Sequence, residues 1–432
     1  MIIGKFILKG ELELLSSALI GSGNNENTDI DVILDNNANP YIPGTSLAGV
    51  IRNYVKDAPS CDSIFGYTND TDSEQSTIIF YDLFLNKLKN KTVNPLVRDG
   101  IKINASTGII EDKAKYDYEI VPMGTVFNLA IEFTLKDKLS SECRHLANLI
   151  TQKLKSETLQ IGAKTTNGLG RVYLKTYKLM HYDFQEKADV CYWLLNKDGK
   201  EIKVESFTNS TNNNLELEIL LELKTSYLSK SYSGDPDLPD VVNYKENKEY
   251  ILKGSGIKGA VRNRCLKILN TISSDNVKNL NMIDKLFGYV NKDTSSSKKG
   301  RFYIQEQILK DFSSETQTRI KIDRFTGGTV DGSKFDAESL FSNKNTNHIK
   351  INVQILDCAE NEACLMLLVL KEFWTGDLAL GGDKNIGRGT MKGVHANIKY
   401  QDKEIEFTVS SSLNNNQNDR DFLENLVKKI NN

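Results

Sequence analysis

Two acidic loops hold the carboxylates that are best placed to do chemistry. Each loop lies between a strand-like segment and a glycine turn, and the aspartates are Asp29, Asp31 and Asp35 in the first loop and Asp235, Asp237 and Asp240 in the second. A carboxylate beside a bound nucleic acid can hold a divalent metal or assist attack by a ribose 2′-hydroxyl. Acidic loops that merely face solvent are also common, so an inert loop is the alternative.

Glycine turns with hydroxyls and cations follow both acidic loops. The first, IPGTSLAGVIR at residues 42–52, places backbone N–H groups at a helix start, where the donors and the helix dipole together favour an anion. The predicted RNA-binding residues are Gly44, Thr45, Ser46 and Arg52 in this turn and Lys253, Ser255, Lys258 and Arg262 in the second. The alternative is a helix capped by Thr45, Ser46 or Ser255, with an arginine that pairs with a surface carboxylate.

Glycine-rich turns near the end of each half are further candidates for contact with a phosphate chain. The segments NGLGR at 167–171 and GGDKNIGRG at 381–389 combine backbone amides, small residues and cations. Their predicted RNA-binding residues are Gly168, Gly170, Arg171, Lys384 and Arg388. Most glycine-rich loops only turn the chain, but these two occupy matching positions, each before a strand.

Residues 101–119 and 320–338 resemble β-hairpins. Each has a short strand, a turn, a variable tip and a closing KYDYE or KFDAE. An exposed hairpin of this kind can wedge between stacked bases, or it can act as a dimer arm. Arg324 in the second tip, where the first half has Ala105, is a predicted RNA-binding residue.

These features recur because the chain is an internal duplication. The blocks that match in the same order are 12–19 with 221–228, 40–53 with 249–263, 64–67 with 286–289, 101–119 with 320–338, and 161–171 with 380–390. Ordered agreement of this kind is improbable by chance. We predict a first domain at 1–184, a linker at 185–214, and a second domain at 215–432 that ends in a short amphipathic helix.

The order of the expected elements predicts the fold class. In each half, period-two alternation predicts a strand, which leads through a loop and a short strand to a helix. Leu47, Ile51 and Val55 form one buried face of the first such helix. Further strands and a helix at 138–155 follow. This β-loop-α-β-β-α-β order predicts an α+β protein with two ferredoxin-like (RRM-like) domains in tandem, each with an inserted hairpin.

Composition narrows the class of protein. The chain has 432 residues, of which 39% are hydrophobic and 26% charged, as in ordinary globular domains. Its six cysteines and four histidines lack metal-ligand spacing, so we expect neither a zinc site nor a disulfide framework. No segment reads as a membrane span or signal peptide, so we expect no membrane partner and a cytoplasmic location. Because the net charge is -2, any surface that binds phosphates must be local.

Taken together, the first strand, the IPGTSLAGVIR turn and helix, the IKIDRFTG hairpin and the terminal glycine loop resemble the RAMP superfamily of CRISPR-associated proteins. More narrowly, they look like two backbone subunits of a type III effector complex fused in tandem. The resemblance covers nearly the whole chain, twice. It implies ferredoxin-like domains that bind the crRNA backbone, with the hairpins as thumbs that displace nucleotides at regular intervals. The implied partners are crRNA, target RNA and other CRISPR effector subunits.

The resemblance also implies cleavage. Such subunits cut the paired target RNA beside each thumb with a loop aspartate and a divalent metal, here expected to be Mg²⁺. In this sequence the catalytic and metal-binding role falls on Asp29 or Asp31 in the first half, with Asp29 preferred, and on Asp240 or Asp237 in the second. Alignment on the Tyr-Ile dipeptides places Asp31 opposite Asp240, whereas alignment on the following glycines places Asp29 opposite Pro239.

Three alternatives stay open. The first is a structural crRNA-binding subunit with inert acidic loops. The second is a crRNA-processing ribonuclease, which would need a histidine near its glycine loop; only His181 and His395 lie downstream of those loops. The third is a duplicated ferredoxin-like protein that does not bind nucleic acid, which the net charge permits.

Overall fold

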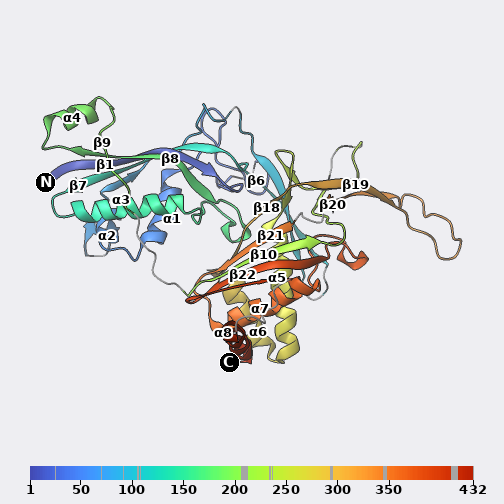
Figure 1. The fold of residues 1–432 in the computed structure, drawn as a ribbon. Helices are drawn as coiled ribbons and strands as arrows, with labels where there is room; N and C mark the ends of the chain where they lie inside the picture. Colours follow the sequence, from blue (N-terminus) through green and yellow to red (C-terminus); the bar gives the residue numbers. More distant parts are fainter. Residues whose placement is uncertain are drawn as a thin grey trace. The chain divides into compact units, whose positions relative to one another are not determined.

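The chain divides into two compact units. The computed structural model describes residues 1–24, 26–69, 71–90, 92–104, 107, 109–205, 213–232, 235, 237–291, 295–343, 348–409 and 417–431. Unit 1 comprises Met1–Thr165 and Leu169–Asn209, and unit 2 comprises Thr166–Gly168 and Ser210–Asn432 (Figure 1). Each unit therefore has its own sheet and its own hydrophobic core.

Unit 1 is an antiparallel sheet with helices packed on both faces (Figure 1). Its strands in spatial order are β4 (Ile78–Phe80), β7 (Val126–Lys136), β1 (Ile2–Leu14), β8 (Val172–Asp183) and β9 (Lys200–Glu201). Its helical segments are α1 (Gly44–Val55), α2 (Cys61–Phe65), α3 (Ser140–Lys155) and α4 (Lys187–Leu194), and the division between the units falls within the short η1 (Thr165–Asn167). Helices α1, α2 and α3 pack on one face of the sheet and α4 on the other. Alternate residues of β1, such as Leu8 and Leu12, point into the core, where they meet Leu47 of α1 and Ile150 of α3. Antiparallel pairing with β7 on one side and β8 on the other places β1 at the centre of the sheet.

Unit 2 repeats this design. Its main sheet runs β17 (Phe302–Ile304), β21 (His348–Ile355), β10 (Leu215–Leu223), β22 (Met391–Tyr400) and β23 (Lys403–Thr408). Its helical segments are α5 (Gly254–Ile272), α6 (Asn276–Phe287), α7 (Glu360–Thr375), η2 (Lys384–Ile386), α8 (Gln417–Val427) and η4 (Lys428–Asn431). The short amphipathic helix expected at the end of the chain is present as α8.

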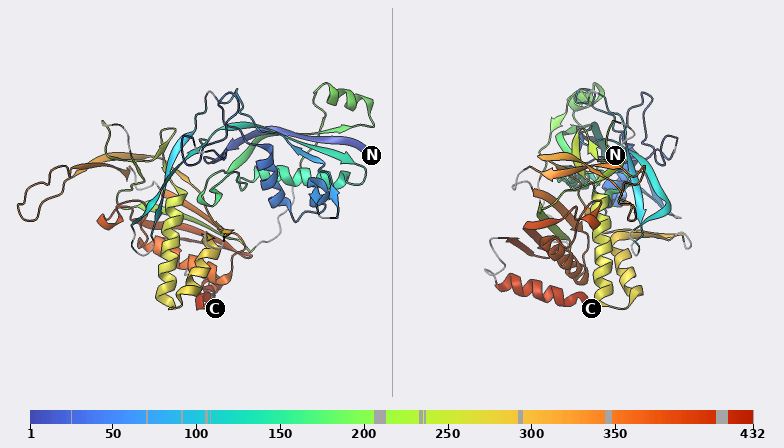
Figure 2. Two further views of the ribbon diagram at one scale, coloured as in Figure 1. Left: turned by 180° about the vertical axis from the view of Figure 1, so that it is seen from behind. Right: turned by 90° about the vertical axis from the view of Figure 1, so that its right-hand side faces the viewer.

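A hairpin is inserted in each unit. In unit 1 it is formed by β5 (Leu96–Ile103) and β6 (Ile110–Ile120), and in unit 2 by β19 (Phe312–Arg319) and β20 (Phe335–Ser342). Figure 2 shows that the β19–β20 hairpin, in brown, projects beyond the rest of its unit. The smaller strands are β2 (Tyr67–Thr68), β3 (Ser73–Glu74), β11 (Lys230–Tyr232), β12 (Val241–Asn243), β13 (Lys245–Glu246), β14 (Glu249–Leu252), β15 (Gly288–Asn291), β16 (Ser296–Lys299) and β18 (Gln307–Leu309).

The duplication extends to individual hydrogen bonds. Strands β4-β7-β1-β8 and β17-β21-β10-β22 have the same spatial order. The Gly170 amide donates to the Ser17 carbonyl (2.8 Å), and the Gly389 amide donates to the Ser226 carbonyl (2.7 Å). These residues stand at matching positions of the repeat. The two units are therefore copies in backbone contacts as well as in sequence.

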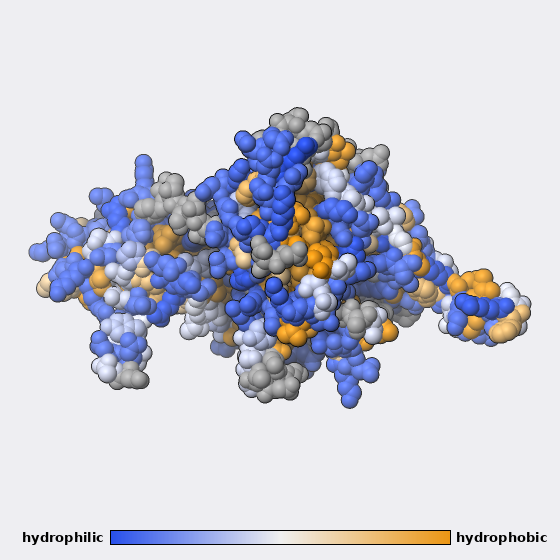
Figure 3. All heavy atoms as spheres, turned by 90° about the horizontal axis from the view of Figure 1, so that it is seen from below, coloured by the Kyte–Doolittle hydropathy of each residue, from blue (hydrophilic) through white to orange (hydrophobic). Residues whose placement is uncertain are grey.

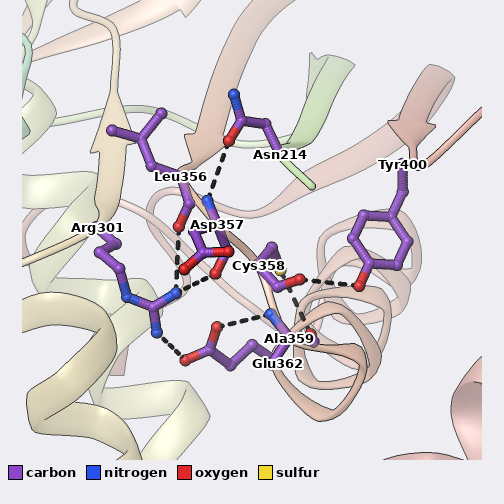
Figure 4. Close-up of polar contacts among 8 residues, drawn as sticks. All are labelled: Asn214, Arg301, Leu356, Asp357, Cys358, Ala359, Glu362 and Tyr400. Carbon is purple, nitrogen blue, oxygen red and sulfur yellow. Dashed lines mark hydrogen bonds and ion pairs between the residues drawn. The ribbon is translucent and has the colours of Figure 1, made fainter. Parts of the chain in front are cut away.

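A buried ion pair anchors helix α7 to the sheet of unit 2 (Figure 4). Arg301 precedes β17 and pairs with Glu362 in the first turn of α7; its guanidinium also donates to the carbonyls of Leu356 and Asp357. The other oxygen of Glu362 accepts from the Ala359 amide (3.1 Å). The Glu362 side chain is only 5% exposed, so its charge depends on these partners.

The sequence predicts an α+β fold and a helix near residues 138–155, and both are confirmed, the helix as α3. The segment 185–214, predicted as a linker, contains α4 and the edge strand β9; its residues 206–212 lie outside the described part of the chain. Among the residues that the structure describes, no helix is long and apolar enough to cross a membrane.

Candidate functional site

In unit 1, the acidic loop is fastened to the second strand of the hairpin. Asp29 is exposed, and its Oδ2 accepts from the Asp117 amide of β6 (3.0 Å). In return, the Asp29 amide donates to Asp117 Oδ1 (2.9 Å). Two residues along β6, Glu119 Oε2 accepts from the Val32 amide (2.9 Å), and the Glu119 amide donates to the Ile30 carbonyl (3.0 Å). The loop and the hairpin base thus form one framework around Asp29.

In unit 2, the second acidic loop is fastened in the same way. Asp240 is exposed, and its Oδ2 accepts from the Asp336 amide of β20 (2.8 Å). Glu338 Oε2 accepts from the Asn243 amide (3.1 Å). Between these two contacts, Val241 pairs with β20 in parallel register. The hairpin base again holds an exposed aspartate.

These contacts determine which aspartates are counterparts. In the hairpin match, Asp336 corresponds to Asp117, and the glutamates that close the two blocks also correspond. Because Asp117 holds Asp29 and Asp336 holds Asp240, Asp29 is the counterpart of Asp240. The alignment that places Asp31 opposite Asp240 is therefore wrong, since loops of unequal length separate the acidic residues from the motifs used as anchors.

Asp31 has a different environment from Asp29. Its side chain is 6% exposed and holds the loop from inside. Oδ2 accepts from the Glu26 and Asn27 amides (2.7 and 3.1 Å), and Oδ1 accepts from the amide and hydroxyl of Thr28 (2.8 and 2.9 Å). Burial alone would raise the pKa of Asp31, but these hydrogen bonds outweigh it and lower the pKa. With both oxygens occupied, Asp31 does not fit the role of a metal ligand.

Asp237 lies in an exposed turn of the second acidic loop. Its amide donates to the Asp235 carboxylate (3.0 Å), so the two residues form a local turn. The hairpin contact in this loop is made by Asp240, three residues later. The geometry therefore favours Asp240 over Asp237 as the partner of Asp29.

The donor set limits the kind of metal site that is possible. Among the described residues, no three His, Cys, Asp or Glu side chains gather as a potential metal cluster. Asp29 and Asp117 bring two carboxylates together in unit 1. In unit 2 the Asp336 amide holds the Asp240 carboxylate, whereas the Asp336 carboxylate accepts from the Thr318 hydroxyl (2.5 Å) and pairs with Lys334 (3.5 Å). Mg²⁺ is commonly bound by one or two carboxylates together with phosphate oxygens and waters. The residues fit a cation that a bound RNA helps to coordinate, and do not fit an all-protein cage.

The two glycine turns begin helices whose first amides are already occupied. The Gly44 amide donates to Asp82 Oδ1 (2.7 Å), and the Gly254 amide donates to Glu306 Oε1 (3.2 Å). Helix α1 begins at Gly44 behind Pro43, and α5 begins at Gly254 behind Lys253. The expectation that Thr45, Ser46 or Ser255 caps these helices is therefore wrong. Thr45 and Ser255 are exposed and Ser46 is half-buried within the first turns.

The paired arginines of these helices bind carboxylates of the protein. Arg52 pairs with Asp62 of α2 (2.9 Å), and Arg262 pairs with Asp284 of α6 (2.8 Å). Arg262 also donates to the Gly288 carbonyl (3.2 Å). The carboxylates stand at matching places before the IFGY and LFGY segments. The ion-pair alternative therefore describes what both arginines do in the isolated chain.

Two lysines of α5 and its cap lie near one another in sequence but differ in environment. The Lys253 ammonium stands 4.6 Å from the centre of the Tyr244 ring, a cation–π contact. Lys258 is half-buried, with its ammonium 3.5 Å from the Phe302 carbonyl. Burial, followed by repulsion from neighbouring cations including Arg262, lowers the pKa of Lys258 to about 8. Lys258 therefore loses its proton at a lower pH than an ordinary lysine.

The glycines of the terminal loops are required by the fold. Gly168, Gly170, Gly387 and Gly389 all have positive φ. A Cβ on Gly170 would lie 1.9 Å from the Ile161 carbonyl oxygen, and one on Gly389 would meet the Leu380 oxygen at 1.7 Å. Only glycine fits these positions, whether or not RNA approaches the loops.

The loop cations differ in how accessible they are. Arg171 is largely buried and reaches Glu157 at 3.5 Å, and burial lowers its pKa. Arg388 is 2% exposed; it donates to Gln317 Oε1 (2.7 Å) and pairs with Asp383 (3.5 Å). Lys384 is exposed. Of the three, Lys384 is placed to meet a ligand from solvent.

The tip of the second hairpin presents an aromatic ring. Asp323 accepts from the Phe325 and Thr326 amides (3.0 and 2.8 Å), which closes the turn and leaves the Phe325 side chain 98% exposed. Arg324 is exposed beside it. Figure 3 shows apolar side chains at this tip, on the right of the view. The first hairpin has a similar turn, in which Asn104 accepts from the Thr107 amide (3.1 Å), but residues 105, 106 and 108 lie outside the described chain.

Sequence reasoning missed the residues that hold the aspartates. Asp117 and Glu119 lie in the KYDYE segment, and Asp336 and Glu338 lie in KFDAE. The available signal was that both hairpin blocks keep an aspartate and end on a glutamate. Which loop these residues hold could not be inferred, because the contact between Asp29 and Asp117 spans 88 residues.

Two α+β units, each with a hairpin that fastens an acidic loop, define a duplicated protein with one candidate site per half. The family model described as the RAMP superfamily matches residues 11–173 and 221–392. The chain belongs to the RAMP superfamily, a group of CRISPR-associated RNA-binding proteins. A comparison with curated proteins gives no significant match.

Proposed function

We propose that this chain is a tandem backbone subunit of a type III CRISPR effector complex, which binds crRNA and cuts complementary target RNA beside each hairpin. Each unit acts as a ferredoxin-like domain with its hairpin as a thumb. Asp29 cuts in unit 1 and Asp240 in unit 2. The observation that carries the proposal is the recurrence of an exposed aspartate on the same hairpin residue in both units.

The chemistry follows from the carboxylates. An exposed aspartate can accept the proton of a ribose 2′-hydroxyl while the 2′-oxygen attacks the adjacent phosphorus. The bond from phosphorus to the 5′-oxygen then breaks, and the 5′-oxygen leaves with a proton from water. A bound Mg²⁺ would neutralise charge on that phosphate, and would be held by Asp29 with Asp117 in unit 1 and by Asp240 in unit 2. Attack by the 2′-hydroxyl predicts products with a 2′,3′-cyclic phosphate and a 5′-hydroxyl.

The RNA grip is proposed to use the exposed polar and basic groups of the predicted set. Thr45, Ser255, Lys384 and Arg324 face solvent, and Phe325 offers a ring on which a base can stack. Arg52 and Arg262 can contribute only if a phosphate competes with their aspartate partners. The proposed partners are crRNA, target RNA and neighbouring effector subunits.

The test is cleavage of a matched target RNA by the assembled complex. We expect Asp29→Ala to remove one cut and Asp240→Ala to remove the other, with RNA affinity unchanged. Asp237→Ala, in the neighbouring exposed turn, is the matched control and should cut normally.

A non-cleaving structural subunit is the second candidate. It is favoured by the hydrogen bonds of Asp29 and Asp240 to backbone amides, since an inert loop would also use its aspartates in this way. Undiminished cutting by the double variant Asp29→Ala/Asp240→Ala would reject the proposed catalytic role of both aspartates and favour this alternative.

A further inference from the structure

The base of each hairpin makes a pair of contacts that we call the clasp. In unit 1 the clasp consists of the Asp117 amide, which binds the Asp29 carboxylate, and the Glu119 carboxylate, which binds the Val32 amide. In unit 2 the same two contacts are made by Asp336 to Asp240 and by Glu338 to Asn243. The clasp therefore holds the aspartate itself and also the loop backbone three residues beyond it.

The clasp is built on a rigid support. In unit 1, Glu119 stands between Tyr118 and Ile120, which are 5% and 0% exposed. In unit 2, the second oxygen of Glu338 accepts from the Tyr250 hydroxyl (3.0 Å) and lies 3.5 Å from the Lys245 ammonium. Both glutamates therefore project from strands that are anchored in the protein, while the aspartates that they help to hold are exposed.

An exposed aspartate without such contacts samples several side-chain rotamers. The hydrogen bond from the Asp117 amide engages only Oδ2 of Asp29 among the described contacts, so it fixes the direction of the carboxylate while Oδ1 points elsewhere. Misplacement of a catalytic group by about 1 Å can cost about 100-fold in rate. Fixing the direction of the carboxylate should therefore increase the rate of cleavage by a large factor.

We propose that Glu119 and Glu338 are positioning residues, which orient Asp29 and Asp240 for cleavage by holding the acidic loops against the hairpins. This inference rests on the proposed cleavage function. The base of each hairpin then controls the rate of cleavage, whereas the tip of the hairpin contacts the RNA. The rate of each cut then depends on the clasp of its own unit.

The test uses the full-length protein in its assembled complex, with a target RNA on which the two cuts give products of different length. We expect Glu119→Ala to lower the rate of the unit 1 cut at saturating RNA by about 10- to 100-fold, with the unit 2 cut and the RNA affinity unchanged. Glu119→Gln should recover most of the rate, because its amide oxygen can still accept from the Val32 amide. Glu338→Ala should slow the unit 2 cut by a similar factor and leave the unit 1 cut unchanged.

Glu142→Ala is the control in unit 1. Glu142 lies in the first turn of α3, where it accepts from the Ser141 hydroxyl (2.7 Å), and it takes no part in the clasp, so both cuts should proceed at the normal rate. Hydrogen exchange supplies a readout that does not depend on cutting: in Glu119→Ala the Val32 amide should exchange faster than in the unaltered protein.

The possible failures are distinguishable. If Asp29→Ala still makes the unit 1 cut, or if the unaltered complex makes no cut, the proposed function fails and the catalytic role of the clasp fails with it. If Asp29→Ala removes the cut but Glu119→Ala does not slow it, the positioning role alone is overturned. A loss of RNA affinity equal to the loss of rate, or unchanged exchange at Val32, also overturns it.

Discussion

Two aspartates that are two positions apart in one loop have opposite surroundings. Asp31 is buried and accepts four hydrogen bonds from its own loop, whereas Asp29 is exposed and is held by a distant strand. Composition and spacing treat the two residues alike. Burial assigns Asp31 a role in shaping the loop. Exposure and the contact with the hairpin identify Asp29 as the residue that can meet a substrate.

Lys258 should make RNA binding depend on pH. Its pKa is lowered to about 8, so its charge is lost as the pH rises from 7 to 9, well below the usual range for lysine. If Lys258 contacts a phosphate, RNA affinity should fall over this interval, since the favourable charge is present below the pKa and absent above it. Binding titrations at pH 7 and pH 9 measure the effect.

The control for this prediction is Lys258→Arg. Arginine remains protonated across the whole interval, so this variant should bind RNA almost equally at both pH values. A fall in affinity of the same size in the variant would show that Lys258 is not the group responsible.

At the scale of elements, one helix of unit 2 is fastened to its sheet by an ion pair. Helix α7 of unit 2 is anchored by Arg301 and Glu362, and Figure 4 shows that the guanidinium also bridges to backbone carbonyls. Because the Glu362 side chain is almost fully buried, removal of Arg301 alone leaves its charge without compensation and is strongly destabilising.

We therefore expect Arg301→Ala to destabilise unit 2 by about 2–4 kcal/mol. Chemical denaturation followed by a probe in α7 measures the change. The double variant Arg301→Met/Glu362→Gln removes both charges and should recover part of the loss. Equal destabilisation by the single and the double variant would contradict the ion-pair explanation.

The elements that could be predicted from the sequence were those with a local signature. Helix α3 follows from periodicity and the first hairpin from the matching block, because these patterns reflect contacts between near neighbours. In the second hairpin β19 ends at Arg319, just before Ile320, where the sequence predicts the first strand to begin. The start of α1 was misplaced, since its first amide is satisfied by Asp82, which is 38 residues away and leaves no local pattern. The pairing of Asp240 with Asp336 spans 96 residues and was invisible for the same reason.

At the scale of the whole molecule, a chain with a net charge of -2 must bind RNA through local groups of cations. Many of its cations are already paired with carboxylates, such as Lys230 and Arg319 with Asp383. Because the chain is duplicated, it carries two proposed RNA-binding surfaces, one in each unit. Affinity for RNA then depends on how many exposed cations both units contribute.

RNA affinity of the full chain should therefore decrease steeply with salt. For about 6–10 phosphate contacts, affinity falls by about 10³- to 10⁵-fold between 50 and 200 mM salt. Arg324→Ala and Lys384→Ala should each reduce the slope by about one phosphate contact. A flat salt dependence of the unaltered protein would favour the alternative in which the duplicated fold does not bind nucleic acid.

The carboxylates that cap α1 and α5 have a consequence for selectivity. Asp82 and Glu306 occupy the first amides of the two helices, so each helix start carries its own tethered anion. A free sulfate or nucleotide must displace that anion unaided and gains little by doing so. A polyanion that is already bound along the unit competes at a high effective concentration. We therefore expect the two helix starts to bind small anions weakly, and to accept a phosphate only from a strand that is already held elsewhere on the unit.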